Sequence, residues 1–146
     1  MKESAQIALT LVKSIFPERM QDMQKVDLHI HVPDGATPKD GPSAGITMTT
    51  ALASLISGIP VSPKVGMTGE ITLQGLIGAI GGLPEKLMAA QRAGVETVYI
   101  PADNEEDLRD VPDEVRKALT IVPVRTARDV LTALSILPQN REALAV

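Results

Sequence analysis

Cysteine and tryptophan are absent from this chain of 146 residues, and Phe16 and Tyr99 are its only aromatic side chains. Without cysteine, neither disulfide bonds nor thiolate chemistry is available. Two aromatic side chains cannot form a platform on which nucleic-acid bases stack. The core must therefore consist of aliphatic and methionine side chains, and we expect an intracellular, cytoplasmic protein.

An excess of basic charge is also absent. The chain has 14 Lys and Arg residues against 18 Asp and Glu residues, which gives a net charge of −4, and the basic residues form no block. Nucleic acid and anionic lipid surfaces are therefore not expected as partners. The 44% hydrophobic and 22% charged residues are typical of a globular protein with about one domain.

The longest uncharged run, residues 41–63, is better explained by a buried helix than by a membrane span. It contains several Ser and Thr residues, and Gly58 and Pro60 interrupt it. The part compatible with a helix, residues 43–57, is roughly 22 Å long, whereas the hydrocarbon core is about 30 Å thick. The first residues have no apolar run after their positive charge, so we expect no export signal.

The hydrophobic pattern predicts a layered mixed α/β domain over residues 1–137 and a tail over residues 138–146. Leu28, Ile30 and Val32 alternate with polar residues, which predicts a strand with one wet face. The glycines between Gly75 and Gly82 indicate a hairpin return. We expect a first helix that starts almost at residue 1 and ends near residue 16, and further helices over residues 43–57, 83–93, 104–111, 113–119 and 127–137. Strands are expected over 26–32, 65–73, 95–100 and 120–124.

Residues 41–45, GPSAG, satisfy the G-x-S-x-G pattern of a hydrolase nucleophile elbow, but only superficially. An elbow needs a strand that runs directly into the serine and a histidine further along the chain. Here a loop rich in Gly and Pro precedes Ser43, and His29 and His31 both lie upstream. Chain order therefore excludes that kind of triad, and a triad of another order stays possible without specific support.

Ser43 lies where a loop meets a helix N-terminus, whose N–H groups favour an oxyanion. As a nucleophile it needs a base, and a lysine can serve if apolar surroundings favour its neutral amine. Lys86 meets this condition, because its neighbours on one helical stripe are apolar: Leu83, Ala89, Ala90 and Ala93.

Two other kinds of site, a metal site and a nucleotide-binding loop, have less support in the sequence. Asp27, His29 and His31 could form a metal site on the predicted strand, but no further ligands follow at suitable spacing. The Gly75 to Gly82 run does not fit a nucleotide-binding loop. We therefore expect no metal in this domain.

Three segments together carry a resemblance to a known family: residues 38–45 (PKDGPSAG), 67–71 (MTGEI) and 81–86 (GGLPEK). In order and separation they closely resemble the proteolytic domain of the Lon protease family, from the first helix to about residue 134. The resemblance implies an α+β fold of the ribosomal protein S5 domain 2-like type. It also implies a serine endopeptidase with a Ser-Lys dyad.

By this resemblance, Ser43 is the nucleophile and Lys86 the general base. Thr68 would orient the lysine amine by a hydrogen bond, and Asp40 lies in the loop that shapes or blocks the site. The domain needs no cofactor of its own, whereas ATP and Mg²⁺ are expected only for an ATPase module. Partners implied by the family are unfolded or damaged polypeptides and further copies of the chain, in a hexameric ring.

In the family, an ATPase module and the first strands of the protease domain precede the helix that opens this chain. The resemblance therefore implies a truncated or naturally short form. The alternative function is a non-catalytic assembly or binding module that keeps the same fold.

Overall fold

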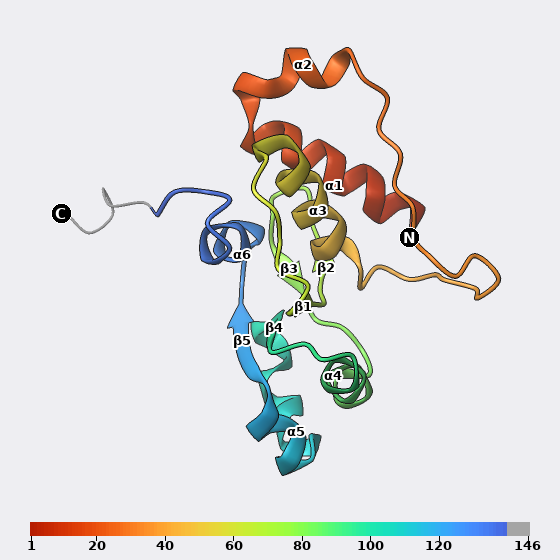
Figure 1. Cartoon of the computed structure of the whole chain (residues 1–146), viewed down its shortest axis with the longest axis vertical. Helices are drawn as coiled ribbons and strands as arrows, with labels where there is room; N and C mark the ends of the chain where they lie inside the picture. The colour runs from red at the N-terminus through yellow and green to blue at the C-terminus, as the bar shows by residue number, and fades with distance from the viewer. Residues whose placement is uncertain (140–146) are drawn as a thin grey trace.

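A parallel sheet of three strands in the order β1–β4–β5 forms the middle layer of the structure, a computed structural model that describes residues 1–139 (Figure 1). The strands are β1 (Val65–Met67), β4 (Thr97–Pro101) and β5 (Thr120–Val124). The register places Tyr99 of β4 opposite Met67 on one side and Val122 on the other. Strand β4 is thus the central strand, and four of its five residues are buried.

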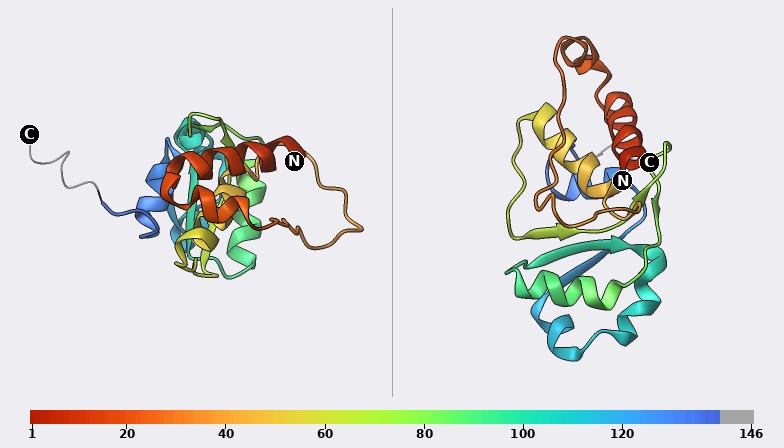
Figure 2. Two further views of the ribbon diagram at one scale, coloured as in Figure 1. Left: turned by 90° about the horizontal axis from the view of Figure 1, so that it is seen from above. Right: turned by 90° about the vertical axis from the view of Figure 1, so that its right-hand side faces the viewer.

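Helices cover both faces of this sheet (Figure 2). The first layer contains α1 (Lys2–Ile15), α3 (Gly45–Ser57) and α6 (Ala127–Ala133), and the second contains α4 (Leu83–Arg92), the 3₁₀ helix η2 (Ala102–Asp110) and α5 (Asp113–Ala118). Because side chains alternate along a strand, Tyr99 packs with residues of the first layer, whereas Val98 and Ile100 pack with residues of the second. The predicted α+β class is confirmed.

Helix α1 forms because its apolar residues recur at three- and four-residue spacing and face α3. Ala8 and Val12 are fully buried against α3 residues such as Leu52. The helix ends before Pro17, as the sequence predicts. Two short helices that the pattern did not indicate follow it, η1 (Pro17–Arg19) and α2 (Met20–Gln24).

The strand predicted over residues 26–32 is wrong. This segment forms no helix or strand, and Val26 and Ile30 are 57% and 40% exposed. Alternation of apolar residues stabilises a strand only where a neighbouring strand pairs with it, and no strand of residues 1–139 does so here. Leu28, half-buried against the cluster of α1 and α3, is the only one of the three predicted inward residues that packs there.

The strand predicted over residues 65–73 is divided into two. After β1 the chain breaks at Thr68 and Gly69 and continues as β2 (Glu70–Ile71), which pairs antiparallel with β3 (Ile77–Gly78) in a second sheet. The predicted hairpin return is therefore confirmed. A Cβ on Gly69 would lie 2.5 Å from Cγ2 of Ile77, so only glycine allows this close approach.

The last helix begins as predicted and ends earlier. A capping box in which Thr126 and Asp129 bond each other's backbone N–H groups starts α6. The helix ends at Ala133 rather than at residue 137, because Ser135 takes a left-handed conformation and the N–H of Ile136 returns to the carbonyl of Leu131. Of the predicted tail, residues 140–146 lie outside the described residues.

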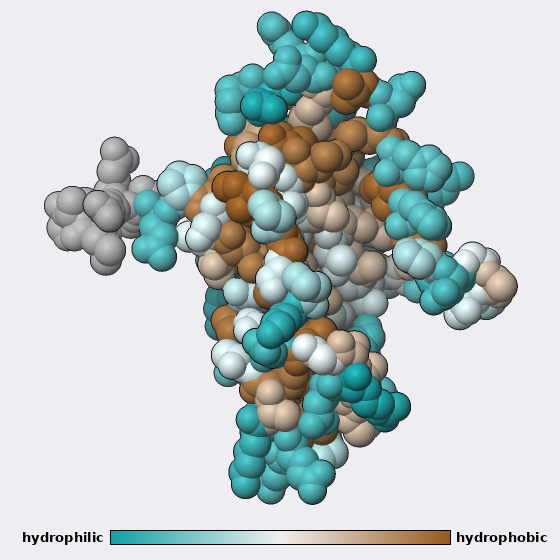
Figure 3. Space-filling model, in the orientation of Figure 1, coloured by the Kyte–Doolittle hydropathy of each residue, from teal (hydrophilic) through white to brown (hydrophobic). Residues whose placement is uncertain are grey.

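The surface in Figure 3 shows apolar side chains gathered over the middle of the molecule and polar ones at the ends near α2 and α5. None of the helices in residues 1–139 combines the length and apolar composition that a membrane crossing requires.

Replacing Gly69 by alanine tests the break between β1 and β2. We expect Gly69→Ala to lower the free energy of unfolding by about 1–3 kcal/mol, because the new methyl group meets Ile77. Urea unfolding measures this loss. Gly81→Ala is the matched control, since a Cβ there has nothing within 4 Å, and equal stability of the two variants would contradict the explanation.

Candidate active site

Ser43 lies in the turn that leads into α3, and its main chain is bound to the break between β1 and β2. Its carbonyl oxygen accepts a hydrogen bond from the N–H of Gly69 at 2.9 Å and one from Oγ1 of Thr68 at 3.4 Å. The N–H of Gly45 donates to the carbonyl of Pro42 at 3.1 Å, which closes the turn. The position of Ser43 thus depends on the two residues of the break.

The first turn of α3 makes further hydrogen bonds to the segment between β1 and β2. The N–H of Ile46 donates to the carbonyl of Gly69 at 3.1 Å, and Oγ1 of Thr47 donates to the carbonyl of Met67 at 3.4 Å. A Cβ on Gly45 would lie 2.8 Å from Cγ2 of Ile71, so this contact needs a glycine. The bonds that hold the turn use the N–H groups of Gly45 and Ile46 and leave out those of Ser43 and Ala44.

Thr68 connects this turn to the central strand and to a cavity. Its N–H donates to the carbonyl of Tyr99 in β4 at 3.1 Å, and the residue is only 8% exposed. Its hydroxyl donates to the Ser43 carbonyl, and its oxygen retains lone pairs that can accept a second bond. Thr68 also lines a cavity of about 290 Å³, and Lys86 is another of its lining residues.

Lys86 is half-buried on α4, in the wall of this cavity. Within residues 1–139 it takes part in no ion pair. Three of the four apolar neighbours predicted for Lys86, Ala89, Ala90 and Ala93, line the same cavity, whereas Leu83 is buried in the core. The remaining lining residues are almost all apolar: Gly66, Met67, Leu87, Ala89, Ala90, Ala93 and Val98.

Asp40 has a different environment from the other predicted residues. Its side chain is fully exposed, accepts a hydrogen bond from the N–H of Gly41 at 2.7 Å, and lies 3.6 Å from the α-amino group of Met1. The Gly41 N–H, and after it the α-amino charge, hold the pKa of the Asp40 carboxyl below its usual range. Asp40 is not among the residues that line the Lys86 cavity.

The alternative metal ligands Asp27, His29 and His31 are all exposed and lie on the segment that is not a strand. In the part of the chain that the structure describes, no group of three or more His, Cys, Asp or Glu residues is arranged to hold a metal ion.

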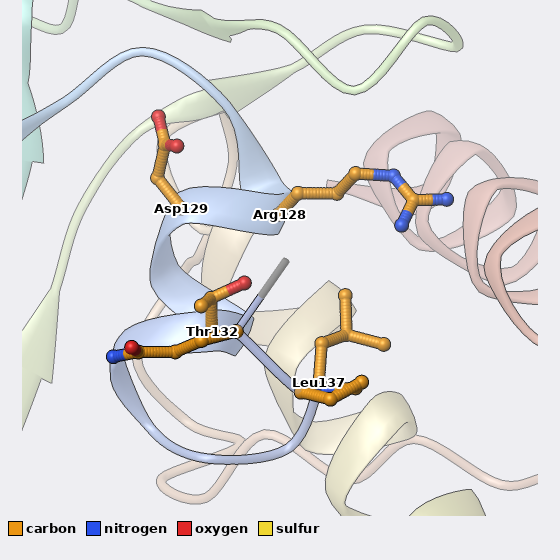
Figure 4. Close-up of a pocket in the computed structure, with 6 residues that line it drawn as sticks. Arg128, Asp129, Thr132 and Leu137 are labelled. Atoms are coloured by element: carbon orange, nitrogen blue, oxygen red, sulfur yellow. The ribbon is translucent and has the colours of Figure 1, made fainter. Parts of the chain in front are cut away.

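A larger hollow, of about 550 Å³, lies beside α6 and is far less suited to chemistry (Figure 4). Asp129 there is engaged in the capping box, since its Oδ2 accepts from the N–H of Thr126 at 3.0 Å. Figure 4 shows the side chain of Arg128 extending away from Asp129. The two charged groups that line the hollow, Arg128 and Asp129, therefore do not converge.

Sequence reasoning missed one residue on which this site depends, Gly69. Its backbone binds Ser43 on one side and Ile46 on the other. The available signal was a glycine inside a predicted strand, which is typical of a bulge or a close approach of two backbones.

Comparison with known proteins identifies the family of the chain. A family model described as the Lon protease (S16) C-terminal proteolytic domain matches residues 1–136. The chain is 59% identical over 131 residues to the Lon protease of Clostridium beijerinckii, which covers 90% of this chain and 16% of that protein. It is 54% identical over 133 residues to that of Methanosarcina barkeri, covering 90% of this chain and 17% of the relative.

A third relative, the Lon protease of Salinispora arenicola, is 53% identical over 149 residues, which covers 98% of this chain and 19% of the relative. These matches define the class of the protein as a proteolytic domain. The chain belongs to the Lon protease C-terminal proteolytic domain family, and it spans 16 to 19% of the length of these three relatives.

The two causes of the Asp40 shift can be separated by NMR titration of its carboxyl group. We expect a pKa below the usual value of about 3.9. Acetylation of the α-amino group should raise this pKa only in part, because the Gly41 N–H still stabilises the carboxylate. An ordinary pKa before acetylation, or no change after it, would contradict this assignment.

Proposed function

We propose that this chain is a serine endopeptidase domain in which Ser43 is the nucleophile and Lys86 the general base. The observation that supports the proposal is the place of Thr68. Its hydroxyl donates to the carbonyl of Ser43, and the residue also lines the cavity of Lys86. Thr68 thus adjoins both residues, and its hydroxyl oxygen can accept a hydrogen bond from the lysine amine.

The proposed reaction follows from these two groups. Ser43 Oγ attacks the peptide carbonyl carbon while its proton passes to the neutral amine of Lys86. The C–N bond then breaks, and Lys86 returns the proton to the leaving amine. Water, deprotonated by the same amine, attacks the resulting ester; the carboxyl product leaves, and the serine hydroxyl is restored. No cofactor is needed for these steps.

Charge on the substrate oxygen is stabilised, in this proposal, at the start of α3. The N–H groups of Ser43 and Ala44 are not used in the bonds that hold the turn. They lie at the positive end of a helix of 13 residues. Such fixed donors stabilise an oxyanion because they need no reorganisation during the reaction.

The wider setting is proposed from the relatives, which are named Lon protease and are several times longer than this chain. We propose that the domain acts on unfolded polypeptides and assembles into a hexameric ring in the cytoplasm. An ATPase module that binds ATP and Mg²⁺ would deliver the substrate.

Replacing Ser43 by alanine distinguishes the peptidase from the alternative, a non-catalytic assembly or binding module. We expect wild type to cleave a fluorescently labelled unstructured polypeptide and Ser43→Ala to be at least about 10³-fold slower, because no nucleophile remains. Ser62→Ala, at an exposed serine, should match wild type. Equal cleavage by Ser43→Ala and wild type, or cleavage by neither, would support the alternative.

The role of Lys86 is tested with a serine-directed fluorophosphonate probe. Since only the neutral amine accepts a proton, labelling of Ser43 should slow as the pH is lowered. Lys86→Gln should reduce the labelling rate by about 10²- to 10⁴-fold, whereas Lys117→Gln, at an exposed lysine of α5, should not change it. A rate that is independent of pH, or unaffected by Lys86→Gln, would exclude Lys86 as the base.

A further inference from the structure

Asn104 is a buried polar residue that the proposed reaction does not use. It is only 2% exposed and lies in η2, three residues after the last residue of β4, Pro101. Burial of a side-chain amide is unfavourable unless its polar atoms are bonded. Its hydrogen bonds therefore indicate what the residue does.

The Asn104 amide binds both polar groups of Ile80. Its Oδ1 accepts from the N–H of Ile80 at 2.9 Å, and its Nδ2 donates to the carbonyl of Ile80 at 2.9 Å. The second hydrogen of Nδ2 goes to Oδ2 of Asp107 at 2.8 Å. The amide thus pairs with Ile80 as a neighbouring strand would, with both donors used.

Ile80 lies in the short connection between β3 and α4, the helix that carries Lys86. Gly81 and Gly82 follow it without side chains to hold the chain, and Gly82 has a φ of +71°. The N–H of Lys86 then donates to the carbonyl of Gly82 at 3.1 Å in the first turn of the helix. A displacement of Ile80 would therefore be passed to Lys86 through only a few residues.

The segments that hold the two proposed catalytic residues both contact the same strand, β4. On the Ser43 side, Thr68 donates to the carbonyl of Tyr99. On the Lys86 side, Leu83 and Leu87 of α4 pack in one cluster with Val98 and Ile100 of β4, and the chain continues from β4 directly into the segment of Asn104.

We infer that Asn104 is a positioning residue, which holds the start of α4 so that the Lys86 amine lies within reach of the Ser43 hydroxyl. The inference rests on the proposed function. Asn104 does not line the Lys86 cavity, so it acts through the backbone of Ile80 rather than on the substrate. A group that only stabilises the fold would leave the geometry at Lys86 unchanged in the folded protein.

The test compares Asn104→Ala with wild type at temperatures where both are folded. For cleavage of a short fluorogenic peptide we expect kcat to fall by about 10- to 100-fold, since small misplacement of a catalytic group has effects of this size. KM should change by less than about twofold, because Asn104 does not contact the cavity. Amide hydrogen exchange should accelerate in residues 79–88 and not in α3.

Two controls separate positioning from stability. Ile136→Ala removes a buried side chain from the cluster of α1, α3 and α6, so it should lower Tm and leave kcat unchanged. Asp107→Ala leaves both Ile80 bonds in place and should keep kcat within about twofold of wild type. If Asp107→Ala loses as much activity as Asn104→Ala, the bonds to Ile80 are not the cause and the inference is overturned.

If Asn104→Ala does not fold, substitutions that move a charge between positions 104 and 107 provide a second test. Asn104→Asp keeps the size of the side chain but places a carboxylate against Asp107 and the carbonyl of Ile80. We expect this variant to lose activity, and adding Asp107→Asn should restore part of it by removing the like charge. Full activity of Asn104→Asp alone would overturn the inference, because this variant lacks the donor to the Ile80 carbonyl.

These measurements distinguish failure of the proposed peptidase function from failure of the positioning role of Asn104. If wild type and Ser43→Ala are equally inactive, the peptidase proposal fails, and the exchange rates still decide whether Asn104 holds residues 79–88. If wild type is active while Asn104→Ala keeps its kcat or its exchange rates, the positioning role alone is wrong.

Discussion

The break between β1 and β2 is the constraint on which the site depends. At Thr68 and Gly69 the chain passes from the first sheet to the second, and the first turn of α3 is bound to this point. Gly69 donates to Ser43 and accepts from Ile46, so the turn is bound in both directions. Backbone hydrogen bonds of this kind position a serine more precisely than side-chain packing alone, because their donors and acceptors have little freedom.

Strand β4 extends this constraint across the molecule. Both of its faces are covered, by the α1, α3 and α6 layer on one side and the α4, η2 and α5 layer on the other (Figure 2). Burial on both faces makes it the least mobile kind of element in a small sheet. One layer carries Ser43 and the other carries Lys86, and Thr68 donates to the Ser43 carbonyl and lines the cavity of Lys86.

Much of this could be predicted from the sequence, where local pattern and chemistry agree. The buried helix, predicted over residues 43–57, follows from an uncharged run too short to span a membrane. The apolar neighbours of Lys86 follow from spacing, and the hairpin follows from its glycines. The strand predicted over residues 26–32 failed because pairing is not a local property. Gly69 and Asn104 were missed because their importance lies in contacts with distant residues, Ser43 and Ile80, which no pattern within one element contains.

The central claim is that Ser43 and Lys86 form one catalytic pair. The most direct measurement is the distance between Ser43 Oγ and Lys86 Nζ in a high-resolution crystal structure of this chain. We expect a hydrogen bond of about 2.6–3.2 Å between these atoms, or slightly longer without substrate. A lysine amine that points into solvent, with Ser43 Oγ bonded elsewhere in every copy, would contradict it.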